Sequence, residues 1–349
     1  MNNIITSIKR QFFFNSHLTQ AVAVLWFISS ILLSIGLLRN NIPVQIIGAI
    51  SGTTYILILS WWLIQSKPHS ENLQDCEPII NLFTNYRFLL YFIILLTLIL
   101  VVLTSVLLQN GWLTLLLSIP ISLAILIIWR KRLNRRFIIA SLAIMIVLAF
   151  VEQLLGSEMS SGLIMPIGAA LMFLAGALLL DHTRLTYIRL LNGEYFKAVK
   201  SFLIGCMLAL PPALLNIISM RLVSPSEFDL LFDRWWEPLY ALQPGIIEEI
   251  WARLLLITLL YALLRPTTNR QPQRAVFWAL LIASFLHGMA HYPGSITNPL
   301  EGIYISLLYG IPLSLLFIKR DLEQAIAYHF FIDLVRFTAF VIWNIAENS

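Results

Sequence analysis

The stretch QPGIIEEIWARLLLITLLYALL, residues 243–264, places charged side chains inside a run that is long enough to cross a bilayer. The charged residues are Glu248, Glu249 and Arg253. A transmembrane helix needs about 20 mostly apolar residues, and a charge at its centre costs at least about 2.5–3.5 kcal/mol. Such a cost is tolerated where charged groups face one another or a water-filled cavity. The stretch therefore predicts a membrane helix that carries a functional site.

The whole chain has the composition of a membrane protein with many spans. Hydrophobic residues make up 59% of its 349 residues and charged residues 12%, against roughly 45–50% and 25% in soluble domains. Apolar runs bounded by charged or turn residues predict an all-α, polytopic transmembrane bundle of about eleven spans. The predicted spans are residues 18–38, 43–65, 88–108, 111–129, 137–154, 160–180, 201–220, 243–264, 275–292, 300–318 and 323–345.

The basic residues predict how these spans are oriented. When the spans alternate from a cytoplasmic N-terminus, most of the 23 Lys and Arg residues fall in cytoplasmic loops, and Arg39, Arg221 and Arg234 fall on the opposite side. This asymmetry is the one found in membrane proteins. We therefore expect an integral protein of the plasma (inner) membrane with its C-terminus on the opposite side. Topology also accounts for the net charge of +5, so no nucleic-acid partner is expected.

Three segments are expected along the chain. Residues 1–180 form an N-terminal six-span extension with no predicted role, and residues 201–349 form a five-span core. Between them, residues 181–200 predict a cytoplasmic amphipathic linker. Residues 222–240 predict an interfacial helix anchored by two tryptophans, which serves either as an ordinary anchor or as a gate beside the site.

The three charges of the opening stretch are expected to divide their roles. On a helix, Glu249 and Arg253 are four residues apart and share a face, with the glutamate in the favourable N-terminal position. Glu248 points about 140° away from Arg253. The spacing therefore predicts a Glu249–Arg253 pair and leaves Glu248 free to face another helix as a general acid or base. The alternative is a salt-bridge network between helices with no reaction.

Two later segments add histidines at helical spacing. His287 and His291 share a face in SFLHGMAH, and His329 and Asp333 share a face in YHFFIDLVR. Histidine can act as a base, a hydrogen-bond donor to an oxyanion or a metal ligand. Straight helices would separate His291 from His329 by more than about 10 Å in depth. Either residues 292–300 turn back into the protein or the last spans are short and tilted.

The three motifs together resemble a known family. Their order, Glu-Glu-x-x-x-Arg, then Gly-x-x-His, then His-x-x-x-Asp, covers roughly residues 200–349. It resembles the CPBP family, the CAAX prenyl endopeptidase and bacteriocin-processing proteins, also called Abi-type intramembrane proteases. The resemblance implies an intramembrane endopeptidase in which a glutamate activates water and two histidines complete the site. The implied catalytic residues are Glu248, His291, His329 and Asp333, with Glu249 and Arg253 in support. At the positions of His287, Leu254 and Asp333 the family often has Phe, Gly and Asn.

The extra histidine bears on the cofactor. We prefer a site without a metal, because His287 is not a motif position. A catalytic zinc would instead take His287, His291 and His329 as nitrogen ligands, with Glu248 as the base. The resemblance implies a peptide or protein substrate, which includes prenylated ones, and the composition implies membrane lipid as the surroundings.

Two functions without proteolysis use the same residues. One is a non-catalytic membrane scaffold or a bacteriocin-immunity or regulatory protein with the same buried polar cluster. The other is a transporter with a proton relay, which an internal sequence repeat would favour, and the sequence contains no convincing one.

Overall fold

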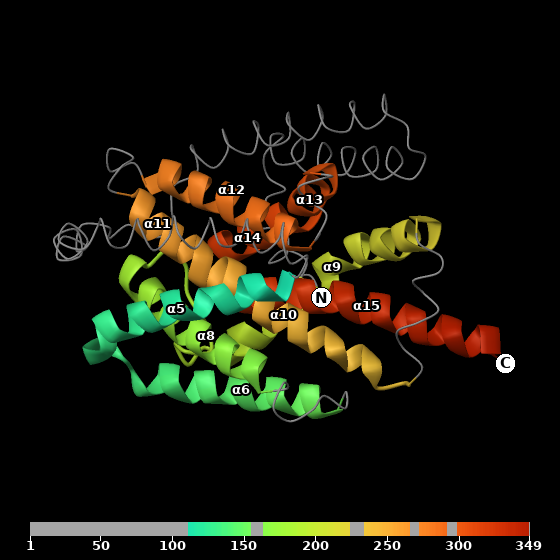
Figure 1. Cartoon of the computed structure of the whole chain (residues 1–349), viewed down its shortest axis with the longest axis horizontal. Coiled ribbons are helices and arrows are strands. Elements are labelled where there is room, and N and C mark those ends of the chain that lie inside the picture. The colour runs from blue at the N-terminus through green and yellow to red at the C-terminus, as the bar shows by residue number, and fades with distance from the viewer. Residues whose placement is uncertain (1–110, 155–162, 224–233, 266–271, 292–298, 349) are drawn as a thin grey trace. The chain divides into compact units, whose positions relative to one another are not determined.

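The computed structural model describes residues 111–154, 163–223, 234–265, 272–291 and 299–348. All regular structure in these residues is helical (Figure 1). Six of the described helical segments are long and apolar enough to cross a membrane. They are Arg135–Leu154, Ile164–Thr183, Tyr195–Ile218, Pro272–His291, Gly302–Lys319 and Leu322–Ala346. The predicted all-helical membrane bundle is therefore confirmed for the described residues. The count of eleven spans is not confirmed. The predicted spans 18–38, 43–65 and 88–108 lie outside the described residues.

From residue 111 onward the helices follow the predicted spans. Six of them are single helices: α5 (Gly111–Trp129), α6 (Arg135–Leu154), α8 (Ile164–Thr183), α9 (Tyr195–Val223), α12 (Pro272–His291) and α15 (Leu322–Asn348). The other two are each built of three segments. One contains α10 (Leu242–Glu248), η5 (Glu249–Ile257) and α11 (Thr258–Leu264), and the other contains α13 (Pro299–Ile305), η6 (Ser306–Gly310) and α14 (Ile311–Lys319). η5 and η6 are π-helical, a wider turn that often occurs at functional sites.

The segment expected to be one interfacial helix, residues 222–240, is broken in its described part. α9 ends at Val223, a turn covers residues 234–236, and the short 3₁₀ helix η4 (Glu237–Ala241) follows. Trp235 is exposed and packs edge-on against Trp236. Residues 224–233 lie outside the described part, so the gate stays a prediction.

α8 lies between α5 and α6 in Figure 1 and packs against both of them as well as against η5. Its small residues, including Ala169 and Ala175, are fully buried and allow close packing against η5. α5 and α6 instead expose large apolar side chains, such as Ile127 and Ile146, as lipid-facing helices do. The N-terminal extension therefore contributes a helix that directly supports the glutamate-bearing segment.

The loop between α8 and α9 fixes the start of α15. Asp321 is fully buried, and its Oδ1 accepts a hydrogen bond of 2.8 Å from the backbone N–H of Gln324. Its Oδ2 lies 2.5 Å from Nε of Arg189. Leu190 N–H donates to Oε1 of Glu323 at 2.8 Å. Burial alone would lower the pKa of Arg189, but the hydrogen bond and charge of Asp321 outweigh it and raise that pKa. The predicted linker is thus anchored to the helix that carries the last motif.

α10 and α15 approach each other closely at Gly245. A Cβ atom at this position would lie 2.9 Å from Cα of Phe330, closer than real Cβ atoms come. Because glycine has no side chain, the two backbones can pack at this distance. The contact lies within one turn of Glu248 on α10 and next to His329 on α15. It therefore sets the spacing between two of the motifs.

Candidate active site

Glu248 and Glu249 lie at the junction of α10 and η5, and their side chains have different surroundings. The side chain of Glu249 is completely buried, whereas that of Glu248 is 14% exposed. Only one of the two adjacent carboxylates is therefore accessible to a small molecule such as water.

The Oε2 atom of Glu248 is surrounded by three imidazoles. It lies 3.0 Å from Nε2 of His287, 3.1 Å from Nε2 of His291 and 3.8 Å from Nε2 of His329. α12 supplies the first two histidines and α15 supplies the third. Three motifs that are far apart in the sequence thus converge on one carboxylate oxygen.

Glu249 makes the predicted ion pair and one further contact. Its Oε1 lies 3.2 Å from Nη1 of Arg253 and accepts a 2.8 Å hydrogen bond from Nδ1 of His329. Arg253 is fully buried and donates from Nη2 to the carbonyl of Gly310 in η6 at 3.3 Å. The predicted Glu249–Arg253 pair is confirmed, and Glu249 also orients one of the histidines.

Asp333 lies on the other side of His329. Its Oδ2 is 3.5 Å from Nε2 of His329, and its Oδ1 is 2.9 Å from Nη2 of Arg336. The longer distance makes Asp333 a weaker partner of His329 than Glu249 is. His329 is therefore held mainly through Nδ1, and Asp333 provides a nearby negative charge.

The hydrogen bonds indicate where the protons of the histidines lie. Nδ1 of His291 donates to the carbonyl of His287 at 3.0 Å, and Nδ1 of His329 donates to Glu249. Both rings therefore turn Nε2 toward Glu248, with these proton positions inferred from the acceptors. Nδ1 of His287 is buried and has no hydrogen-bond partner among the described residues. The contact of His287 with Glu248 is consequently a donation from Nε2.

His291 and His329 meet at one site, although ideal straight helices would separate them in depth. Both side chains reach the same oxygen of Glu248, at 3.1 Å and 3.8 Å. Both histidines lie on single α-helices, α12 and α15, so the packing of these two helices around Glu248 brings their rings together. Residues 292–298, which were one of the two suggested explanations, lie outside the described part.

The motif glycine Gly288 places α12 against its neighbour. A Cβ atom there would overlap Oγ of Ser306 and the carbonyl of Gly302. Ser306 in turn donates to the carbonyl of Gly302 at 2.7 Å. The absence of a side chain at Gly288 therefore lets α12 pack closely against α13 and η6. His287 precedes this contact in the sequence and His291 follows it.

Sequence reasoning missed two contacts that hold this region. Gln243 on α10 donates from Nε2 to Oε1 of Glu152 on α6. Trp251 on η5 donates from Nε1 to Oγ of Ser118 on α5 at 2.7 Å. Both join the glutamate-bearing segment to helices of the N-terminal extension. A single glutamate or serine near a span carries no sequence signal that could have revealed these partners.

The residues present fit a divalent metal ion, but not in the predicted combination. Glu248, His287 and His291 each offer a ligand atom, and these atoms lie within 4.8 Å of one another. Two imidazoles and a carboxylate form a zinc-type donor set. The hydrogen bond from Nδ1 of His291 to a carbonyl is the kind that orients metal-bound histidines. Glu248 thus takes the place that the sequence prediction gave to His329.

Comparison with known protein families matches residues 231–335 to the family model described as type II CAAX prenyl endopeptidase Rce1-like. These residues form an Rce1-like domain. The finding supports the CPBP-type protease family that the three motifs suggested. No curated protein and no solved structure matches the chain.

The Rce1-like domain includes every residue around Glu248 described above, except Arg336. It does not include Ser118 or Glu152, which brace it from outside. The family is one of membrane proteases that act on peptides or proteins.

Proposed function

We propose that this protein is an intramembrane endopeptidase that hydrolyses a peptide bond in or beside the bilayer. The observation that carries the proposal is the position of Glu248 Oε2 within 3.8 Å of three imidazole nitrogens. A partly exposed carboxylate with proton-carrying groups around it suits general acid–base catalysis. The Rce1-like match over residues 231–335 supports the same reaction class.

In the proposed reaction Glu248 acts on water. Its carboxylate accepts a proton while the water oxygen attacks the carbonyl carbon of the substrate. The carbonyl oxygen becomes an oxyanion. In the proposal His291 and His329 are imidazolium ions, protonated on Nε2 as well as on Nδ1, and their Nε2–H groups stabilise the oxyanion by hydrogen bonds. Glu248 then returns the proton to the departing amine as the C–N bond breaks. One water is consumed, and a carboxylate and an amine are released.

The supporting residues hold this arrangement in place. Glu249 fixes the ring of His329 through Nδ1, and Arg253 neutralises Glu249 within the bundle. Asp333 adds a second, weaker contact on His329. These residues are positioning groups in the proposal, since the exposed face of the cluster belongs to Glu248 and His291.

The proposed reaction runs through Glu248 and needs no metal. The site would hold a divalent ion through Glu248, His287 and His291, and such an ion supplies Lewis-acid polarisation of a carbonyl when bound. The proposal keeps the metal-free route, because the two motif histidines and Glu248 already provide a base and two hydrogen-bond donors.

The test uses the full chain reconstituted in lipid vesicles. A peptide ending in a prenylated Cys-a-a-X motif and the same peptide without the prenyl group are offered, and products are identified by mass spectrometry. We expect cleavage of the prenylated peptide by the wild type and none by Glu248→Gln. A scaffold that uses the same polar cluster for packing would cleave neither peptide, and that result would overturn the proposal.

A further inference from the structure

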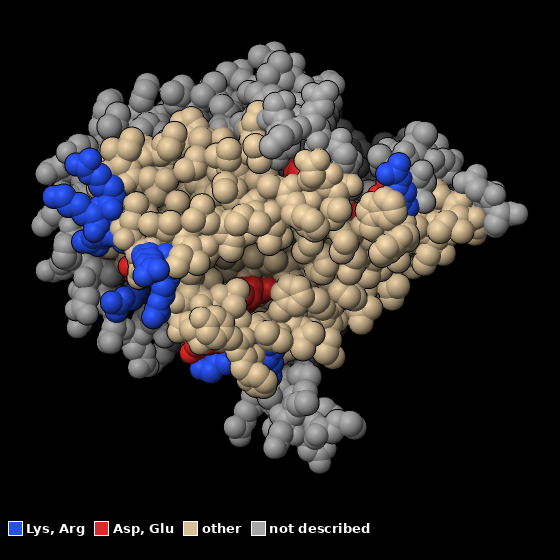
Figure 2. Space-filling view, turned by 90° about the horizontal axis from the view of Figure 1, so that it is seen from below, with Lys and Arg blue, Asp and Glu red and all other residues tan. Residues whose placement is uncertain are grey.

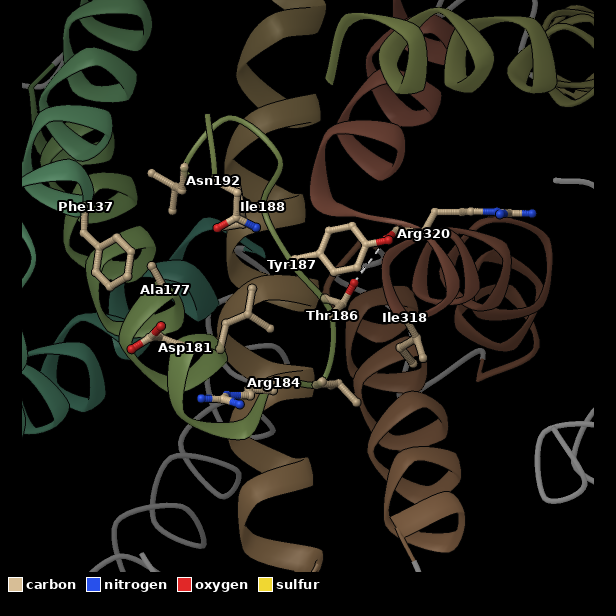
Figure 3. A pocket seen from close by; sticks show the side chains of 13 residues that line it. Phe137, Ala177, Asp181, Arg184, Thr186, Tyr187, Ile188, Asn192, Ile318 and Arg320 are labelled. Carbon is tan, nitrogen blue, oxygen red and sulfur yellow. Dashed lines mark hydrogen bonds between the residues drawn. The ribbon is translucent and has the colours of Figure 1, made fainter. Parts of the chain in front are cut away.

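A cavity of about 370 Å³ lies away from the proposed active site, at the end of the bundle where α5 meets α6. Its walls come from α6, the end of α8, the loop after α8, and the end of α14 (Figure 3). None of the residues around Glu248 lines it. Most of its lining precedes residue 231, so it lies largely outside the Rce1-like domain.

The charged groups at the cavity are mostly basic. Arg184 and Asp181 line it, are exposed, and form no ion pair or hydrogen bond with side chains of the described residues. Figure 3 shows both side chains on the same side of the cavity, beside Phe137. Arg320 also lines the cavity, and two further arginines contact residues of the neighbouring chain segment. Arg132 contacts His182 at 3.1 Å, and Arg136 donates to the carbonyl of Leu191 at 3.3 Å.

The basic character extends beyond the cavity. The turn between α5 and α6 and the first residues of α6 expose five basic residues, Arg130, Lys131, Arg132, Arg135 and Arg136. Figure 2 shows most of the Lys and Arg side chains of this face on its left, beside a largely uncharged area, with smaller groups elsewhere. A ligand drawn to this end would carry negative charge.

Part of the cavity wall is apolar, and the cavity adjoins a helix that exposes apolar side chains. Phe137, Leu180 and Ile188 are buried and line the cavity. Immediately after Phe137 on α6, Ile138 and Ile139 expose 41% and 55% of their surface. A ligand seated here would have a polar part near Arg184 and an apolar part that continues along the outer face of α6.

We propose that this cavity binds the headgroup of an anionic phospholipid. In the proposed complex Arg184 and Arg136 contact the phosphate, and Phe137 and Leu180 contact the glycerol and the first acyl carbons. Basic pockets between membrane helices are suited to such headgroups. A small soluble anion would use the arginines but leave the apolar wall exposed to water. A lipid with a neutral headgroup would gain no advantage from the excess of arginines.

The experiment measures lipid binding by native mass spectrometry on the purified full chain. Phosphatidylglycerol and phosphatidylcholine with the same acyl chains are compared, and soluble glycerol phosphate is offered as a competitor. We expect retention of phosphatidylglycerol to exceed that of phosphatidylcholine several-fold. We also expect glycerol phosphate to compete poorly. Equal retention of the two lipids, or full displacement by glycerol phosphate, overturns the proposal.

Matched variants locate the binding site. Arg184→Gln should weaken phosphatidylglycerol binding about tenfold, the effect of losing about 1.4 kcal/mol. Lys131→Gln makes the same change in net charge at an exposed residue that does not line the cavity, and should leave binding unchanged. Asp181→Asn removes the carboxylate and should retain or tighten binding. Equal losses for Arg184→Gln and Lys131→Gln would indicate a diffuse surface attraction and contradict the proposal. The wild-type lipid preference stands as a test even where a variant fails to fold.

Discussion

Glu248 and Glu249 are neighbours in the sequence and have opposite surroundings. Glu249 is completely buried between Arg253 and His329, whereas Glu248 is partly exposed and faces three histidines. The same substitution at the two positions should therefore have different consequences. At Glu249 it affects the folded state, and at Glu248 it affects the reaction.

Glu249→Gln should lower the stability of the protein. It leaves Arg253 as a buried charge without its carboxylate partner, and breaking a buried pair costs about 3–5 kcal/mol. The measurement is the thermal unfolding midpoint in detergent. Glu194→Gln is the matched control, because it breaks ion pairs with Arg189 and Lys197 that are partly exposed to solvent. An unchanged midpoint for Glu249→Gln, with activity lost, would reverse the roles of the two glutamates.

His287→Phe should keep proteolytic activity within about tenfold of the wild type, the cost of one hydrogen bond of about 1.4 kcal/mol. The ring is buried and its Nδ1 has no partner in the described part of the chain, so phenylalanine can occupy the space. His291→Ala and His329→Ala should instead abolish activity. Activity and metal content are measured on the same preparations.

The contrary result for His287 would identify a metal enzyme. If His287→Phe loses both activity and about one equivalent of zinc that the wild type carries, then Glu248, His287 and His291 form a catalytic metal site. The metal-free route proposed above would then be wrong.

Among individual residues, the sequence predicted the ion pair whose two members lie on the same helix. The four-residue spacing was sufficient for Glu249 and Arg253, because both residues belong to one helical segment. The contacts of Glu248 with His287 and of Gln243 with Glu152 could not be foreseen. They depend on how separate helices pack, and no local pattern in the sequence encodes that packing.

At the scale of the helices, glycines control how closely the site-bearing elements approach. Gly288→Ala should reduce activity strongly with a smaller effect on folding, because its Cβ would push α12 away from Gly302 and Ser306. His287 and His291 would move with that helix, and small displacements in an active site are costly. Activity and thermal midpoint should be compared with those of Ala290→Gly on the same helix. A Gly288→Ala protein with full activity would show that the close contact is not needed.

The helices themselves were largely predictable, and their internal irregularities were not. Long apolar runs between charged residues predicted the eight helical stretches from residue 111 onward, with bounds within about six residues. The π-helical segments at Glu249–Ile257 and Ser306–Gly310 were missed. A π-helical turn departs from regular α-helical hydrogen bonding and is rare. Its presence depends on the packing around the segment, so the sequence of the segment alone does not predict it.

For the whole molecule, the distribution of basic residues predicts opposite sides of the membrane for the α5–α6 turn and the C-terminus. Reporter fusions at Arg132 and Ser349 test this directly, with the fusion at Arg132 expected to report the cytoplasm. The described helices alone do not fix the orientation. Fusions that report the same side would remove the eleven-span topology, because an odd change in the number of spans is required to produce them.

The described helices that precede residue 200 contact the glutamate-bearing segment directly. α8 packs against η5, α5 reaches Trp251 through Ser118, and α6 reaches Gln243 through Glu152. The role of these helices could not be predicted, since the family resemblance begins only near residue 200. Their contacts assign them a supporting function for the glutamate-bearing segment, beside the lipid cavity proposed at their basic end.

In the proposed reaction Glu248 activates water for peptide hydrolysis. The most direct measurement is single-turnover cleavage by the reconstituted full chain in ¹⁸O-labelled water, with both the product and the protein analysed by mass spectrometry. The account predicts one ¹⁸O atom in the new carboxylate of the product, none in the side chain of Glu248, and no cleavage by Glu248→Gln. Cleavage by Glu248→Gln at the wild-type rate, or label appearing in the Glu248 carboxylate, would contradict it.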